Sequence, residues 1–212
     1  MMNDYYPFPE VKAVNVPAKK LIVFIHGLGS DGNDLISLAP LIQQQLPDYH
    51  FISPHGVEAY DMAPYGRQWF SLSDRNPYKI LELVAKNVLL LGEIIKSAQN
   101  SLGLSNKDTA IIGFSQGCMI GLYLTLIQSE PFEHMIGFSG RLVPPPKCIN
   151  KNTPVCLIHG VEDEVIEVKE LDHMSRYLNI HSIKNDTLKI PNLGHTIDNQ
   201  GLEFALQFIK NN

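Results

Sequence analysis

The sequence predicts an α/β fold with a mostly parallel central sheet and helices on both of its faces. Short apolar runs alternate with longer amphipathic segments from Leu21 to the end of the chain. Several of these runs, such as LIVFI at 21–25 and VCLI at 155–158, are continuously apolar. Such runs are typical of strands buried on both faces of a parallel sheet. No repeat or linker-like segment interrupts the 212 residues, so we expect a single domain over 1–212.

The expected strands are the short apolar runs, and the expected helices are the longer segments between them. The strands are expected at Leu21–Ile25, Tyr49–Ser53, Thr109–Phe114, His134–Ser139, Pro154–His159 and Thr187–Ile190. The helices are expected at Gly32–Leu46, Tyr78–Ser101, Ser115–Gln128, Val165–Tyr177 and Asn199–Lys210. Glu10–Val16 is expected to add an edge strand. Strands that alternate with helices in this way imply right-handed crossover connections.

Composition and charge disfavour several classes of protein. Hydrophobic residues make up 44% and charged residues 18%, which fits neither a disordered chain nor a coiled coil. The net charge is −5 and no basic run stands out, so we expect no nucleic-acid partner. The three cysteines form no C-x-x-C pair and the histidines lack zinc-binding spacing, so neither a metal nor another cofactor is expected.

The apolar runs are also too short for a bilayer span, and the first twenty residues lack the apolar stretch of a signal peptide. We therefore expect a cytoplasmic protein without stable membrane insertion.

The motif Gly113-Phe114-Ser115-Gln116-Gly117 stands between an apolar strand and an apolar helix. A serine hydroxyl is a weak nucleophile that needs both a neighbouring base and an exposed position. Glycines on either side of the serine permit the sharp strand-to-helix turn that presents it. The helix N-terminus that follows favours developing negative charge. This context favours Ser115 as a nucleophile over a tight turn with an incidental serine.

A second glycine-rich turn, His26-Gly27-Leu28-Gly29, follows the first expected strand. A tetrahedral oxyanion needs two N–H donors: one from the residue after the nucleophile, here Gln116, and one from an early strand-to-helix loop. The second donor is then the amide of Leu28. The alternative is a glycine-rich turn that only leads into the next helix. A phosphate-binding loop is disfavoured because no Lys-Ser/Thr pair follows.

Asp163 and His195 each follow an expected strand, downstream of Ser115. A histidine base needs a carboxylate that holds one tautomer and stabilises the imidazolium. Of the eight histidines, His195 is the one that lies at a strand terminus downstream of both the serine and the aspartate. The sequence leaves three competing carboxylates, which are Glu162, Glu164 and Asp198.

This combination of motifs resembles the phospholipase/carboxylesterase family of α/β-hydrolases, which includes the acyl-protein thioesterases. The resemblance spans about Leu21 to Phe208, and the matching residues are HGLG with Asp31 and Gly32 (26–32), Trp69-Phe70, GFSQG (113–117), HG-x-x-D-x-V (159–165) and GH (194–195). It implies an α/β-hydrolase fold with Ser115, Asp163 and His195 as catalytic triad. It also implies that the amides of Leu28 and Gln116 form the oxyanion hole, and that Trp69 and Phe70 bind substrate.

The chain departs from the family's usual pattern at Ser71, Cys118 and Glu164. None of these positions belongs to the triad, although Ser71 bears on the substrate pocket. Cys118 follows the motif on the expected helix, and we interpret it as a small packing residue.

The function implied by the resemblance is hydrolysis of the carboxylic ester of a small or lipid-like acyl substrate through an acyl-enzyme. The alternatives are an acyl-protein thioesterase or lysophospholipase and, further off, a hydrolase-fold protein that binds without catalysis. The family often dimerises, and the sequence leaves a homodimer open. Only 47 and 31 residues separate the three triad positions, which leaves room for a minimal lid at most. We expect an open site bordered by the aromatic segment 55–77.

Overall fold

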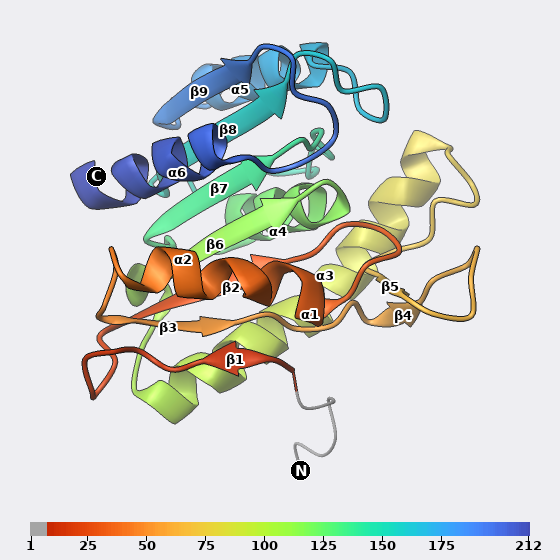
Figure 1. The fold of residues 1–212 in the computed structure, drawn as a ribbon. Coiled ribbons are helices and arrows are strands. Elements are labelled where there is room, and N and C mark those ends of the chain that lie inside the picture. The colour runs from red at the N-terminus through yellow and green to blue at the C-terminus, as the bar shows by residue number, and fades with distance from the viewer. Residues whose placement is uncertain (1–7) are drawn as a thin grey trace.

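The computed structural model describes residues 8–212, in which a seven-stranded sheet lies between two layers of helices (Figure 1). The strand order is β1-β3-β2-β6-β7-β8-β9. β1 pairs with β3 in antiparallel orientation, and the other neighbouring pairs are parallel. The strands are β1 (Glu10–Val11), β2 (Lys20–Ile25), β3 (Tyr49–Ile52), β6 (Thr109–Phe114), β7 (His134–Phe138), β8 (Val155–Gly160) and β9 (Asn185–Ile190). This arrangement confirms the expected α/β-hydrolase fold.

Helices cover both faces of the sheet, with α1, α2 and α6 on the near face of Figure 1 and α3, α4 and α5 behind it. Their bounds are α1 (Gly32–Leu35), α2 (Ala39–Gln43), α3 (Pro77–Leu102), α4 (Gln116–Ile127), α5 (Lys169–Ile180) and α6 (Asn199–Asn211). Two 3-10 turns, η1 (Ile36–Leu38) and η2 (Asn106–Asp108), precede α2 and β6. A separate hairpin is formed by β4 (Glu58–Ala59) and β5 (Arg67–Gln68).

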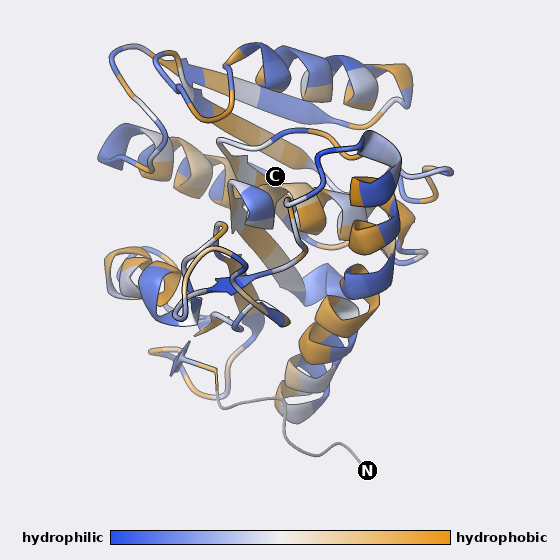
Figure 2. Cartoon of the chain, turned by 90° about the vertical axis from the view of Figure 1, so that its right-hand side faces the viewer, coloured by the Kyte–Doolittle hydropathy of each residue, from blue (hydrophilic) through white to orange (hydrophobic). Residues whose placement is uncertain are grey.

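The strands are continuously apolar because their side chains alternate between two buried layers. In β2, Leu21, Val23 and Ile25 belong to the cluster under α3, α4 and α5, whereas Ile22 and Phe24 belong to the cluster under α1, α2 and α6. All five are fully buried. Figure 2 shows that the outer helices carry both hydrophobic and hydrophilic residues, as helices with one buried face do.

Three expected elements are different in the structure. The expected helix over 32–46 is broken into α1, η1 and α2, and a proline, Pro40, stands in the first turn of α2. Proline has no amide hydrogen to donate to a preceding turn, so a helix starts there more readily than it passes through. The expected edge strand over 10–16 is reduced to β1, because the chain then turns away and the Asn15 amide donates to Pro47 O.

The third difference is at α5, which begins at Lys169 instead of Val165. The amides of Val165 and Ile166 donate to the Asp163 carboxylate at 2.9 and 2.8 Å, and this local turn replaces the first helical turn. The loop that precedes α5 thus also holds the Asp163 side chain in place.

The parallel strands end at the edge drawn on the right of Figure 1, where the β4–β5 hairpin also lies. β6, β8 and β9 end there, which brings the segments after them close together although they are far apart in sequence. No helix within residues 8–212 is both long and apolar enough to cross a membrane.

Candidate active site

Ser115 lies in a tight turn between β6 and α4 and has a φ of 54°, in the left-handed region that side chains rarely adopt. Its flanking glycines are required by sterics. A Cβ at Gly117 would lie 1.8 Å from Ile25 O, and one at Gly113 would lie 2.5 Å from Gly117 O. The Ser115 amide donates to Phe138 O of β7 at 2.9 Å, which fixes the turn against the neighbouring strand.

The structure brings Ser115, His195 and Asp163 into one chain of hydrogen bonds. His195 Nε2 lies 2.9 Å from Ser115 Oγ, and His195 Nδ1 lies 2.7 Å from Asp163 Oδ2. A carboxylate only accepts, so Nδ1 carries the hydrogen and Nε2 is left to accept from the serine hydroxyl. This is the arrangement in which a histidine takes up a serine proton.

Asp163 is buried and is held as a carboxylate by its donors. Burial alone would raise the pKa of Asp163, but the Ile166 amide, His195 and the Val165 amide outweigh it, and the pKa falls below its ordinary value. Asp163 therefore stays ionised beside His195 at neutral pH.

His159 is a neighbour of Asp163 that the sequence did not bring into the site. Its side chain is fully buried, and its Nε2 lies 2.8 Å from Ile166 O and 3.2 Å from Asp163 Oδ2. Both partners accept, so Nε2 carries the hydrogen and His159 adds a further donor beside the carboxylate. His159 stands four residues before Asp163 at the end of β8, and this spacing was the feature of the sequence that could have placed it in the site.

Leu28 and Gln116 line the same cleft as Ser115 and His195. Within residues 8–212, neither of their backbone amides donates to a protein acceptor, whereas the next amide, that of Gly29, donates to Arg67 O at 2.9 Å. The Gln116 amide is the first of α4, and the first amides of a helix have no partner inside it. Two free N–H groups therefore lie at the cleft of Ser115.

The structure does not bring Trp69 and Phe70 to the wall of this cleft, so their expected contact with substrate stays a prediction without support from the geometry. Both side chains are fully buried in the core. The Trp69 indole donates to His26 O at 2.9 Å, which turns the ring inward. Leu72 and Arg75, slightly further along segment 55–77, reach the cleft instead.

The main chain at Trp69 and Phe70 is bound to the side chain of Gln116, which is 1% exposed. Gln116 Oε1 accepts from Trp69 N at 2.8 Å, and Gln116 Nε2 donates to Phe70 O at 2.7 Å. The indole bond to His26 O continues this network to the turn that carries Leu28. The two turns with free amides are thus connected through a buried segment.

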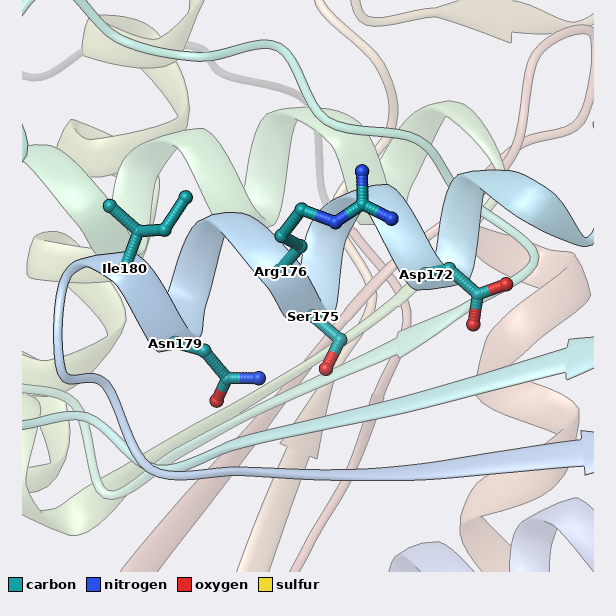
Figure 3. Close-up of a pocket in the computed structure, with 5 residues that line it drawn as sticks. All are labelled: Asp172, Ser175, Arg176, Asn179 and Ile180. Atoms are coloured by element: carbon teal, nitrogen blue, oxygen red, sulfur yellow. The ribbon is translucent and has the colours of Figure 1, made fainter.

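The cleft at Ser115 has a volume of about 460 Å³. Its wall combines apolar and charged side chains, namely Leu28, Leu72, Arg75, Ser115, Gln116, Met119, Arg141, Glu164, Val165, Ile166, Glu167, Lys169, Glu170 and His195. A hollow of about 510 Å³ on α5 contains no triad residue, and the side chains that line it all come from that one helix (Figure 3). The candidate site is therefore the cleft at the strand ends.

Cys118, the other nucleophilic side chain near Ser115, is fully buried. A Cβ at Gly137 or Gly140 would lie 2.4 Å from its sulfur, so it fills the space that these glycines leave. Burial raises the pKa of the Cys118 thiol to about 12. Its expected packing role is confirmed. No group of three or more metal-ligating side chains occurs in the described part of the chain.

The fold and the arrangement at Ser115 define the class as an α/β-hydrolase. Residues 7–212 match the model of the Phospholipase/Carboxylesterase family, and the chain belongs to that family. Family membership classes it as a carboxylic ester hydrolase.

Three relatives are similar over most of the chain. Esterase YpfH of Escherichia coli (strain K12) is 31% identical over 99% of this chain and 89% of its own length. Acyl-protein thioesterase 1 of Eremothecium gossypii is 30% identical over 92% and 89%. The crystal structure of esterase PE8 has a TM-score of 0.90 and 34% identity, over 96% of this chain and 97% of that one.

Proposed function

We propose that the chain cleaves carboxylic esters by nucleophilic catalysis, with Ser115 as nucleophile, His195 as base and Asp163 as its partner. The observation that carries this proposal is the pair of hydrogen bonds, 2.9 and 2.7 Å long, that joins the three side chains at the cleft. The strained backbone of Ser115 is further support, because strain of this kind is retained where a side chain must be presented.

In the proposed reaction, Ser115 Oγ attacks the acyl carbonyl carbon while His195 Nε2 takes the hydroxyl proton. The oxyanion of the tetrahedral intermediate accepts from the free amides of Leu28 and Gln116, each of which contributes about 3 kcal/mol to the transition state. His195 then gives its proton to the leaving alcohol or thiol, and the acyl group stays on Ser115. Water deprotonated by His195 hydrolyses this acyl-enzyme and restores the serine.

The side chain of Gln116 supports this step without touching the substrate. Its two hydrogen bonds hold the main chain at Trp69 and Phe70, which in turn holds the His26 turn through the indole. Gln116 is thus a positioning residue that sets the distance between the two oxyanion amides.

The proposed substrates are small or lipid-like acyl esters. Thioester hydrolysis is the second candidate, because several relatives are named acyl-protein thioesterase 1. A cavity of about 440 Å³ beside the cleft, lined mostly by apolar side chains, leaves space for an acyl chain in either reaction. A protein that binds without catalysis is disfavoured by the complete chain of hydrogen bonds from Ser115 to Asp163.

The test is hydrolysis of p-nitrophenyl esters and matched acyl thioesters of increasing chain length. We expect saturable hydrolysis by the wild type and no rate above buffer for Ser115→Ala. Ser101→Ala, a matched change at an exposed serine near the end of α3, should keep the wild-type rate. Hydrolysis by Ser115→Ala at the wild-type rate would exclude the proposed nucleophile. The ratio of thioester to ester hydrolysis distinguishes the two candidates.

A further inference from the structure

Two arginines, Arg75 and Arg141, lie where the cleft of Ser115 adjoins a second cavity. Both line the 460 Å³ cleft, and both also line the neighbouring cavity of about 440 Å³. They come from separate parts of the chain, Arg75 from the segment before α3 and Arg141 from the loop after β7. Two separate parts of the chain therefore bring an arginine to the same boundary.

Neither guanidinium has a hydrogen bond or ion pair with any residue in the described range 8–212. Among the other charged groups nearby, Lys169 binds Glu167 at 2.6 Å. Glu170, which also lines both cavities, lies 3.2 Å from His173 Nδ1, and this ring offsets its charge only when it is protonated. An arginine has five N–H donors arranged to bind a carboxylate or phosphate, so two of them facing a cavity leave many donors without a protein acceptor.

The negative charge at this boundary offsets the pair only in part. Of the carboxylates in the cleft wall, Glu167 binds Lys169, Glu164 lines the cleft but not the second cavity, and Glu170 lines both cavities with the two arginines. The second cavity is otherwise mostly apolar, with Ile80, Leu81, Leu142, Val143 and Pro144 in its wall. The boundary between the cavities thus carries two arginines and one carboxylate, an excess of one positive charge next to a mostly apolar space.

We propose that Arg75 and Arg141 bind an anionic group, a carboxylate or a phosphate, of the ester substrate, whose apolar part enters the second cavity. This inference rests on the proposed reaction at Ser115, and it names the substrate class as anionic esters. Two guanidiniums bind such a group through charge-assisted hydrogen bonds, which are the strong ones in proteins. They select among substrates and take no part in the chemistry at the carbonyl.

The test compares esters that differ in one charge. On the acyl side, p-nitrophenyl hydrogen glutarate is compared with p-nitrophenyl valerate. On the alcohol side, 3-carboxyphenyl butyrate is compared with phenyl butyrate. A phenyl butyrate that carries a phosphate in place of the carboxylate then shows which of the two anionic groups is bound. The measured quantity is the ratio of kcat/KM for the anionic ester over that for the neutral ester. The variants are Arg75→Gln, Arg141→Gln and their combination. The control is Lys169→Gln, which removes a cation of the same cleft that is paired with Glu167.

We expect that, on at least one side of the ester bond, each arginine variant lowers this ratio about tenfold, the cost of one charged hydrogen bond. Hydrolysis of the neutral ester should stay within about twofold, and Lys169→Gln should leave the ratio unchanged. The proposal is overturned if both ratios stay unchanged in the double variant, or if Lys169→Gln lowers them as much. If the wild type hydrolyses none of these esters, the reaction at Ser115 itself is wrong, and this result is distinct from the other two.

Discussion

His134 makes the stability of the fold sensitive to acid. It begins β7, is 2% exposed, and neither of its ring nitrogens has a hydrogen-bond partner among the described residues. The ring meets Phe208 edge-on, with centroids 5.5 Å apart. Burial, together with the charges of Lys20 and Lys184, lowers the pKa of His134 to about 4. The folded protein therefore disfavours the protonated imidazole.

The sign and size of the effect follow from linkage. The unfolded chain takes up the proton near the ordinary pKa of 6.5, whereas the folded chain takes it up near 4. The stability is fully present above pH 6.5 and is lost as the pH falls from there towards 4, because the unfolded state binds more protons in this window. At pH 5 the loss from this residue is about 2 kcal/mol, and below pH 4 it reaches about 3 kcal/mol.

The variant His134→Leu removes the titrating group and keeps an apolar contact with Phe208. Urea unfolding of wild type and variant at pH 7.5 and pH 5.0 gives four free energies of unfolding. We expect the loss between the two pH values to be smaller in the variant by about 2 kcal/mol. His26, whose pKa burial also lowers to about 4, is present in both proteins and cancels from the difference.

His173→Asn is the control, because the side chain of His173 is 49% exposed and a change there should keep the wild-type loss. An equal acid loss in wild type and His134→Leu, with equal m-values, would refute the reasoning.

Three further changes test the site and its support. Gly117→Ala would place a Cβ 1.8 Å from Ile25 O and should prevent folding or lower the Tm sharply. In the control Gly92→Ala, the nearest atom to the new Cβ would be 3.7 Å away, and the free energy of unfolding should rise by about 0.5–1 kcal/mol. Thermal melts of the two variants measure the difference. Gln116→Met removes both hydrogen bonds to the Trp69–Phe70 main chain and should lower kcat about tenfold with KM unchanged, and an unchanged kcat would remove its positioning role. Trp69→Phe loses the bond to His26 O and should cost about 1–3 kcal/mol of stability in urea unfolding, and a rise in KM without loss of stability would return Trp69 to the substrate pocket.

The fold class and the three residues joined at the cleft were predictable because their signals are local. A strand buried on both faces must be apolar at every position, as β2 is, so it is visible as a continuous run. The turn at Ser115 needs glycines two positions away on each side. Strand ends that meet at one edge favoured His195 as base, whereas the choice of Asp163 over the competing carboxylates came from the resemblance to the family.

The rest depends on tertiary contacts that no local pattern records. A tryptophan in the segment 55–77 looks the same in sequence whether its indole faces substrate or core, and only the structure shows that the indole of Trp69 is buried and donates to His26 O. Arg75 and Arg141 are distant in sequence and line the same two cavities only because the fold places their two loops there. Helix α5 begins at Lys169 because the amides of residues 165 and 166 donate to the Asp163 carboxylate instead of forming a helical turn. Hydrophobic periodicity in the sequence does not predict such side-chain hydrogen bonds.

The most direct test of the central claim is labelling of the intact protein by a fluorophosphonate probe, with the modified residue located by mass spectrometry. A fluorophosphonate reacts with a serine whose proton is taken up by a neighbouring base. We predict one label per chain, on Ser115, with none on Ser115→Ala and a much slower reaction on His195→Ala. A label on another residue, or equal labelling of Ser115→Ala and wild type, would contradict the proposed reaction.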